Sequence, residues 1–302
     1  MPEQEDIIFH KPVLVEEVLH YLNVRPNKVY LDVTFGSGGH TRAILKRDPT
    51  CNVVALDWDQ TSLDTYGSLL QEEFGDRLML VWANFASLYR LVKKIGIAKF
   101  DGILADFGTS QMQIFQKKGF SVHRDTPLDM RMSRSHHKET AADILAHATE
   151  KELRDIFWTL GEERHTKKIV SAIIQERKIK PIKTTGQLAR LVQKVVPMPS
   201  GAKRRIHPAT QVFQALRIYV NKELDNITSF LSVAVTLLNS EGRLVCISFH
   251  SLEDRLVKRF FKDQADLGKV RLLTPKAVVP TEEEVLSNRA SRSSKLRAIE
   301  YL

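Results

Sequence analysis

Glycines and acids follow the first two apolar runs of this sequence, and their spacing fits a site for a nucleoside-containing cofactor. A short run at residues 29–33 leads into Gly36-Ser37-Gly38-Gly39-His40. Glycines let a backbone turn sharply and approach a ligand closely, and the helix that follows presents free N–H groups. A second run ends at Asp57, 21 residues after Gly36. A carboxylate there can accept hydrogen bonds from both hydroxyls of a ribose.

The residues missing from this turn indicate which cofactor it would bind. A dinucleotide site needs a third glycine where this chain has Thr41, and the Asp32 carboxylate would repel a pyrophosphate. S-adenosylmethionine has no phosphate and carries a cationic sulfonium and an amino group, both of which a nearby acid attracts. The pattern therefore favours S-adenosylmethionine over a dinucleotide, and a purely structural glycine turn is the remaining alternative.

The net charge of +9 is concentrated in one segment. Residues 112–205 contain 20 Lys or Arg and 10 Asp or Glu, whereas the remainder contains 25 and 26. A solvated helical surface is one explanation. Confinement of the surplus to one block, ending in Lys203-Arg204-Arg205, instead favours a surface for a nucleic-acid backbone.

Composition limits the cellular setting. Cys51 and Cys246 lie in apolar runs, which is typical of reduced packing residues. The N-terminus lacks the pattern of a signal peptide, and no run reaches the roughly 18 apolar residues of a membrane span. We expect a cytoplasmic protein without a membrane partner. His136-His137 has no cysteine or acid at metal spacing, so no metal site is predicted.

The elements that must position these residues alternate between strand and helix. After a leading helix at residues 12–22, strands are expected at 29–33, 52–57, 78–82 and 100–106, with helices at 39–47, 60–74 and 86–95 between them. This order implies parallel βαβ units with right-handed crossovers.

The alternation stops after Asp106. Amphipathic helices are expected at 150–160, 166–176 and 185–195. The alternation then resumes with a helix at 209–238 broken near Asn221, a strand at 242–248 and a helix at 252–261. Two late strands at 270–273 and 295–302 are expected to pair antiparallel, with a long loop between them. The prediction is a methyltransferase-like domain of residues 1–111 and 206–302, with residues 112–205 as an inserted basic helical domain that recognises the substrate.

Polar residues at the expected strand ends form the candidate site, because ligands of such sheets bind at the carboxyl ends of the strands. Asp57 would bind the ribose, Phe85 would lie against the adenine with Asn84 nearby, and Asp106 would lie at the reacting centre. Each of these polar residues taken alone could instead cap a helix or form a turn.

His250 has two interpretations. It could act as a general base with Asp254 behind it. The same stretch fits a helix start capped by Ser251 with an acid three residues later, which we favour.

Longer phrases of the sequence are not generic to α/β proteins. Two of them are Pro127-Leu128-Asp129-Met130-Arg131-Met132 and Phe249-His250-Ser251-Leu252-Glu253-Asp254-Arg255, and others lie at residues 10–14, 32–40, 101–108, 119–121, 161–164 and 207–218. Together they resemble the RsmH (MraW) family, bacterial enzymes that methylate the exocyclic N4 of a cytosine in the decoding centre of 16S ribosomal RNA. The resemblance covers nearly the whole chain.

The resemblance implies the fold, the reaction and a set of contacts. The expected fold is α/β, a Rossmann-like class I S-adenosylmethionine-dependent methyltransferase sheet with an inserted all-helical domain. The implied cofactor contacts, to which the glycine turn adds Gly36, are Gly38, Gly39, His40, Asp57, Phe85, Asp106 and Gln113, the last on the resemblance alone.

The expected chemistry is methyl transfer to a splayed-out cytosine beside Asp106 and Ser110, the catalytic candidates, with Phe107 or another aromatic on the ring. The expected partner is 16S rRNA, within a small ribosomal subunit and not DNA, held by the basic insertion and arginines 289, 292 and 297. A homodimer is left open. The alternatives are a small-molecule methyltransferase, a non-catalytic RNA-binding protein on the same fold and, least favoured, an NAD-dependent oxidoreductase.

Overall fold

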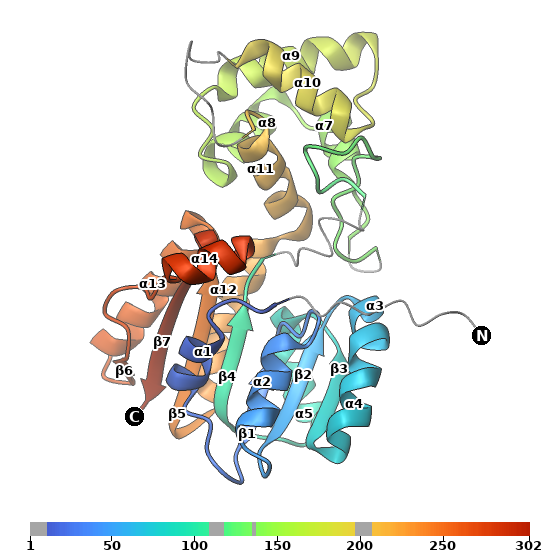
Figure 1. Ribbon diagram of the computed structural model, residues 1–302. Helices are drawn as coiled ribbons and strands as arrows, with labels where there is room; N and C mark the ends of the chain where they lie inside the picture. Colours follow the sequence, from blue (N-terminus) through green and yellow to red (C-terminus); the bar gives the residue numbers. More distant parts are fainter. Residues whose placement is uncertain (1–10, 109–117, 135–136, 197–206) are drawn as a thin grey trace, which may run out of the picture. The chain divides into compact units, whose positions relative to one another are not determined.

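The computed structural model (Figure 1) describes residues 11–108, 118–134, 137–196 and 207–302. The chain divides into two compact units. The first contains residues up to Gly108 and from Leu224 onward, and the second contains the residues between them.

A seven-stranded sheet forms the centre of the first unit. In chain order its strands are β1 Val29–Asp32, β2 Asn52–Asp57, β3 Leu78–Trp82, β4 Phe100–Asp106, β5 Leu238–Ser248, β6 Val270–Leu272 and β7 Lys295–Tyr301. The spatial order is β3-β2-β1-β4-β5-β7-β6, and β7 runs antiparallel to both of its neighbours. The order reverses between β1 and β4, so the carboxyl ends of these strands form the switch point where ligands of such sheets bind.

Helices cover both faces of this sheet because successive side chains of a strand point to opposite sides. On one face Leu31, Leu56 and Ile103 pack in a buried cluster with residues of α5 Leu88–Ile95, α12 Glu223–Ala234 and α13 Ser251–Asp266. The other face packs against α1 Val15–Leu22, α2 Gly39–Arg47 and α4 Ser68–Phe74, of which α1 and α2 lie in front of the strands in Figure 1. Before α4 the chain forms a short helix, α3 Gln60–Ser62, and a π-helical turn, Leu63–Gly67.

Among the described residues of the second unit the regular secondary structure is helical, apart from one isolated bridge between Pro127 and Thr184, and residues 118–134 and 137–140 form turns and irregular segments. Its helices are α7 Ala141–His147, α8 Glu150–Asp155 with a π-helical continuation over Ile156–Leu160, α9 Thr166–Ile179, α10 Thr185–Val195 and α11 Thr210–Asn221. Capping boxes begin three of them, because Thr140, Thr149 and Thr184 each accept a hydrogen bond from the backbone N–H three residues later.

One boundary differs from the sequence-based prediction. The predicted break near Asn221 is confirmed, since Lys222 adopts φ 51° between α11 and α12. However, Phe213 and Leu216 of α11 are buried in the core of the second unit, which therefore extends to Glu223 rather than ending at residue 205. The predicted helix at 209–238 thus begins in one unit and ends in the other.

The region between β6 and β7 is more ordered than the predicted long loop. It contains α14 Glu282–Ser287 and a 3-10 helix over Arg289–Ser293, while the predicted antiparallel pairing of the two strands is confirmed. Among the described residues, no helix has the length and apolar character needed to cross a bilayer.

Candidate active site

The turn after β1 needs glycine for two different reasons. Gly38 has φ 78°, and a Cβ there would lie 2.8 Å from Cζ of Phe35. Gly39 begins α2 and packs on a ring, because its Cβ would lie 2.8 Å from Cγ of Pro12. The sequence did not predict this contact of Pro12, which places Pro12 beside the glycine turn. Gly36, with φ 55°, would accommodate a Cβ without a clash, 3.9 Å from the carbonyl oxygen of Thr34, and it donates its N–H to the end of β2.

Asp57 ends β2 with its carboxylate directed at this turn. Its Oδ2 accepts from the Gly36 N–H at 2.7 Å and its Oδ1 accepts from the Asp59 N–H at 2.8 Å. Burial raises the pKa of Asp57 to about 6, although the two backbone N–H groups act in the opposite direction. Each oxygen has a second lone pair, so the carboxylate can still accept hydrogen bonds from a ligand's hydroxyls.

A buried hydrogen-bonded network links the ends of β1 and β4. Asp32 is buried, and its Oδ1 accepts from the Thr34 N–H at 3.0 Å. Its Oδ2 accepts from the hydroxyl of Thr41 at 2.7 Å. The Asp106 N–H in turn donates to Oγ1 of Thr34 at 2.7 Å. Burial raises the pKa of Asp32, and the neighbouring His40 and the Thr41 hydroxyl oppose that shift. Asp32 therefore stabilises the glycine turn by joining the residues before and after it through hydrogen bonds.

The side chains of His40 and Asp106 lie close together, but several of their buried polar atoms make no hydrogen bond within the described residues. Nε2 of His40 lies 3.5 Å from Oδ2 of Asp106. Among the described residues, neither ring nitrogen of His40 nor Oδ1 of Asp106 has a hydrogen-bond partner, although all three atoms are buried. Because buried polar atoms are normally paired, this arrangement indicates a place where a polar ligand completes the bonding.

The aromatic side of the site differs in part from expectation. Asn84 caps a 3-10 helix over Phe85–Ser87 by accepting from the Ala86 N–H at 2.9 Å, so it has the structural role that a lone asparagine suggests. Phe85 is half-buried, with its ring centroid 5.6 Å from that of Phe230 and 6.5 Å from that of Trp58. Its free part remains available for an adenine, and Trp58 is an aromatic neighbour that the sequence did not single out.

Phe107 cannot stack on a substrate base as expected. It is 2% exposed, and its ring centroid lies 6.1 Å from that of Phe85 and 6.0 Å from that of Phe230. The ring belongs to the core beneath the site. Two further candidates, Ser110 and Gln113, lie outside the described residues.

Comparisons with known proteins agree with this geometry. The model of the MraW methylase family matches residues 7–302. The chain belongs to this family. Two proteins named ribosomal RNA small subunit methyltransferase H are similar to this methylase. The one from Carboxydothermus hydrogenoformans is 43% identical over 97% of this chain and 98% of its own length. The one from Cyanothece sp. is 45% identical over 99% of this chain and 97% of its own length.

Solved structures are more distant. The crystal structure of an rRNA methylase from Streptococcus thermophilus is 10% identical, with a TM-score of 0.45, and covers 95% of both chains. The family resemblance and the class I methyltransferase sheet expected from the sequence are both confirmed.

The tail of this methylase holds the segment that packs on the glycine turn. Asn288 donates from Nδ2 to the carbonyl of Lys11 at 2.9 Å, and Oε1 of Glu284 accepts from the Leu14 N–H at 2.8 Å. Thus residues about 270 apart in sequence fix Pro12 against Gly39. The tail therefore contributes to the shape of the candidate site.

Two interpretations of charged residues near the tail change. Arg297 is not available to RNA, because it is 8% exposed and its Nε donates to Oδ1 of Asp254 at 2.6 Å. Arg289 and Arg292 are exposed, as an RNA contact requires. The cap of α13 is His250 rather than Ser251, since its Nδ1 accepts from the Glu253 N–H. The favoured interpretation of His250 to Asp254 as a capped helix start is therefore confirmed, with the cap one residue earlier than predicted.

Proposed function

We propose that this methylase transfers a methyl group from S-adenosylmethionine to the exocyclic N4 of a cytosine in the decoding centre of 16S rRNA. The observation that carries the proposal is the match of the MraW family model to residues 7–302. Relatives at 43% and 45% identity bear the name of a small-subunit rRNA methyltransferase.

The residues at the strand ends fit S-adenosylmethionine. Asp57 would accept from the ribose hydroxyls, the free part of Phe85 would lie against the adenine, and Gly36, Gly38 and Gly39 would let the backbone approach the ligand. The buried atoms of His40 and Asp106 without hydrogen-bond partners match the amino and carboxylate groups of the cofactor. Gln113 is retained as a further cofactor contact on the family resemblance.

The cofactor, when bound, supplies an electrophilic methyl group on a cationic sulfur. Cytosine N4 is a weak nucleophile because its lone pair is delocalised into the ring, so the protein must align it. Oδ1 of Asp106 would accept a hydrogen bond from the N4 amino group, and Ser110 would orient the base. The network through Thr34 and Asp32 would keep Asp106 in place. The N4 proton becomes acidic as the methyl group is transferred, so no strong base is required.

The second unit would recognise the RNA. It contains 22 Lys or Arg and 11 Asp or Glu, whereas the first unit contains 23 and 25. Arg289 and Arg292 of the tail would add contacts to the backbone. If six to ten phosphates are contacted, raising the salt concentration from about 50 to 200 mM should weaken binding by about a thousandfold or more. A small ribosomal subunit is the proposed form of the substrate, and the cytoplasm is the proposed location.

Comparison of acceptors tests the proposal. Radiolabelled S-adenosylmethionine is incubated with the protein and either small ribosomal subunits lacking the modification, protein-free 16S rRNA or free cytidine. Label in RNA but not in cytidine is expected. Label in cytidine alone would identify a small-molecule methyltransferase, and cofactor binding without transfer to any RNA would identify a non-catalytic protein.

A further inference from the structure

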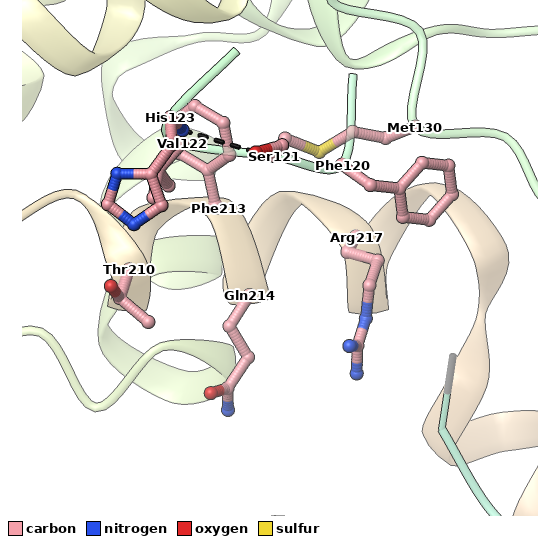
Figure 2. A pocket seen from close by; sticks show the side chains of 9 residues that line it. All are labelled: Phe120, Ser121, Val122, His123, Met130, Thr210, Phe213, Gln214 and Arg217. Atoms are coloured by element: carbon pink, nitrogen blue, oxygen red, sulfur yellow. Dashed lines mark hydrogen bonds between the residues drawn. The ribbon is translucent and has the colours of Figure 1, made fainter. Parts of the chain in front are cut away.

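A pocket of about 240 Å³ lies entirely within the second unit, along α11 (Figure 2). Thr210, Gln214 and Arg217 line it from this helix. Their spacing of four and three residues places them on one side of the helix, and Figure 2 shows all three side chains leaving that side. The side thus presents a hydroxyl, an amide and a guanidinium in a row.

Two aromatic rings from outside α11 also line the pocket. Phe120 is half-buried and His123 is exposed. The His123 ring meets the ring of His207 edge to face, with centroids 5.7 Å apart, and the His123 N–H donates to Oγ of Ser121 at 3.2 Å. These contacts fix the local shape of the segment that carries both rings.

The charge around this segment favours an anionic ligand. Exposed Lys118 and Arg124 bracket the two aromatic residues in sequence. The neighbouring acids are engaged elsewhere. Oδ1 of Asp125 accepts from the Gly186 N–H at 2.9 Å, and Asp129 forms an ion pair with an arginine two residues later.

The arginine of the pocket is held in place. Nε and Nη2 of Arg217 donate to the two carboxylate oxygens of Glu223 at 2.9 and 2.8 Å. A bidentate pair fixes the guanidinium plane, and such planes stack well on bases. Arg217 therefore contributes a flat, oriented surface at the end of the polar row.

We infer that this pocket binds one unstacked base of 16S rRNA other than the methylated cytosine, an inference that rests on the proposed function. Its volume lies just below the range of about 300–1,000 Å³ typical of pockets for drug-sized ligands, which suits a single base. Aromatic side chains stack on splayed bases, and the Gln214 amide offers both a donor and acceptor to a base edge.

The base is one other than the methylated cytosine, for a chemical reason. Among the residues that the structure describes, the pocket lining contains no carboxylate to accept from an exocyclic amino group and no proposed cofactor residue. It can therefore hold and identify a base, whereas methyl transfer requires the groups at the strand ends of the first unit. Its role is to fix the register of the RNA.

The test uses the full-length methylase and small ribosomal subunits purified from a strain that lacks the modification. Phe120→Ala and Gln214→Ala are each compared with Tyr219→Ala, an exposed aromatic of the same helix outside the pocket. Methylation rates are measured against subunit concentration, and the affinity for S-adenosylmethionine is measured by calorimetry. Ultraviolet crosslinking then identifies the nucleotide that contacts the peptide carrying Phe120.

We expect each pocket variant to raise KM for the subunit about tenfold, with kcat and cofactor affinity within twofold of wild type, because one stacked base contributes this much. Tyr219→Ala should match wild type, and the crosslink should fall on a 16S rRNA nucleotide other than the methylated cytosine. A wild-type KM in both pocket variants, a loss confined to kcat, or a crosslink only to the methylated cytosine itself would overturn the inference while leaving the proposed function intact.

Failure of the wild-type protein to methylate any RNA would overturn the proposed function and this inference with it. Gln214 is part-exposed, so its variant decides the question if Phe120→Ala does not fold.

Discussion

Replacement of Thr41 by valine tests the buried network behind the glycine turn. Thr41 and Asp32 are 0% and 1% exposed, and the threonine hydroxyl donates to the carboxylate at 2.7 Å. Valine keeps the shape of the side chain and removes the donor. A hydrogen bond to a charged group contributes about 1.5–3 kcal/mol, so Thr41→Val should lower the free energy of unfolding at pH 7 by about 2 kcal/mol.

Thr41→Ser is the matched control, because it keeps the hydroxyl and loses a methyl group, which costs about 1 kcal/mol. Urea denaturation of both variants at pH 7 measures the difference. The excess cost of valine should shrink as the pH falls through the raised pKa of Asp32, since a neutral carboxyl gains less from the hydroxyl. Equal or greater destabilisation by serine would refute the role of this hydrogen bond.

Three further predictions concern the same unit. Gly38→Ala should cost about 2 kcal/mol more than Gly96→Ala, because the two have φ of 78° and 76° but only Gly38 would clash; equal unfolding free energies would contradict this. Asp57→Asn should gain stability relative to wild type as the pH rises from about 4 to 6, because wild type with its raised pKa loses stability over that window; denaturation at both pH values checks the sign. Arg297→Ala should lower the free energy of unfolding by about 1.5–3 kcal/mol, because the half-buried Asp254 loses its charged hydrogen bonds and keeps only its 3.6 Å contact with Lys295; unchanged stability with weaker RNA binding would restore Arg297 as an RNA contact.

The sheet and its strand ends could be predicted from the sequence because their signals are local. Apolar runs with polar ends give the strands, and parallel pairing then places Asp32, Asp57 and Asp106 at one edge. The family resemblance extended this to the reaction. The roles of Ser110 and Gln113 stay predictions, since neither residue is described.

The remaining details depend on contacts that spacing does not reveal. The ion pair of Arg297 with Asp254 joins residues 43 apart, and the packing of Pro12 on Gly39 depends on a tail about 270 residues away. The apolar side of α11 would fit the core of either unit, and its spacing in the sequence does not tell the two apart. The sequence-based prediction therefore assigned this helix to the wrong unit.

Mapping the methyl group on the RNA tests the central proposal most directly. Small ribosomal subunits lacking the modification are treated with the protein and isotope-labelled S-adenosylmethionine, and the RNA is digested and analysed by mass spectrometry. We predict one labelled nucleoside, a cytidine methylated at N4, from the decoding centre of 16S rRNA. Label at another atom, in another base or only outside the decoding centre would contradict the proposed function.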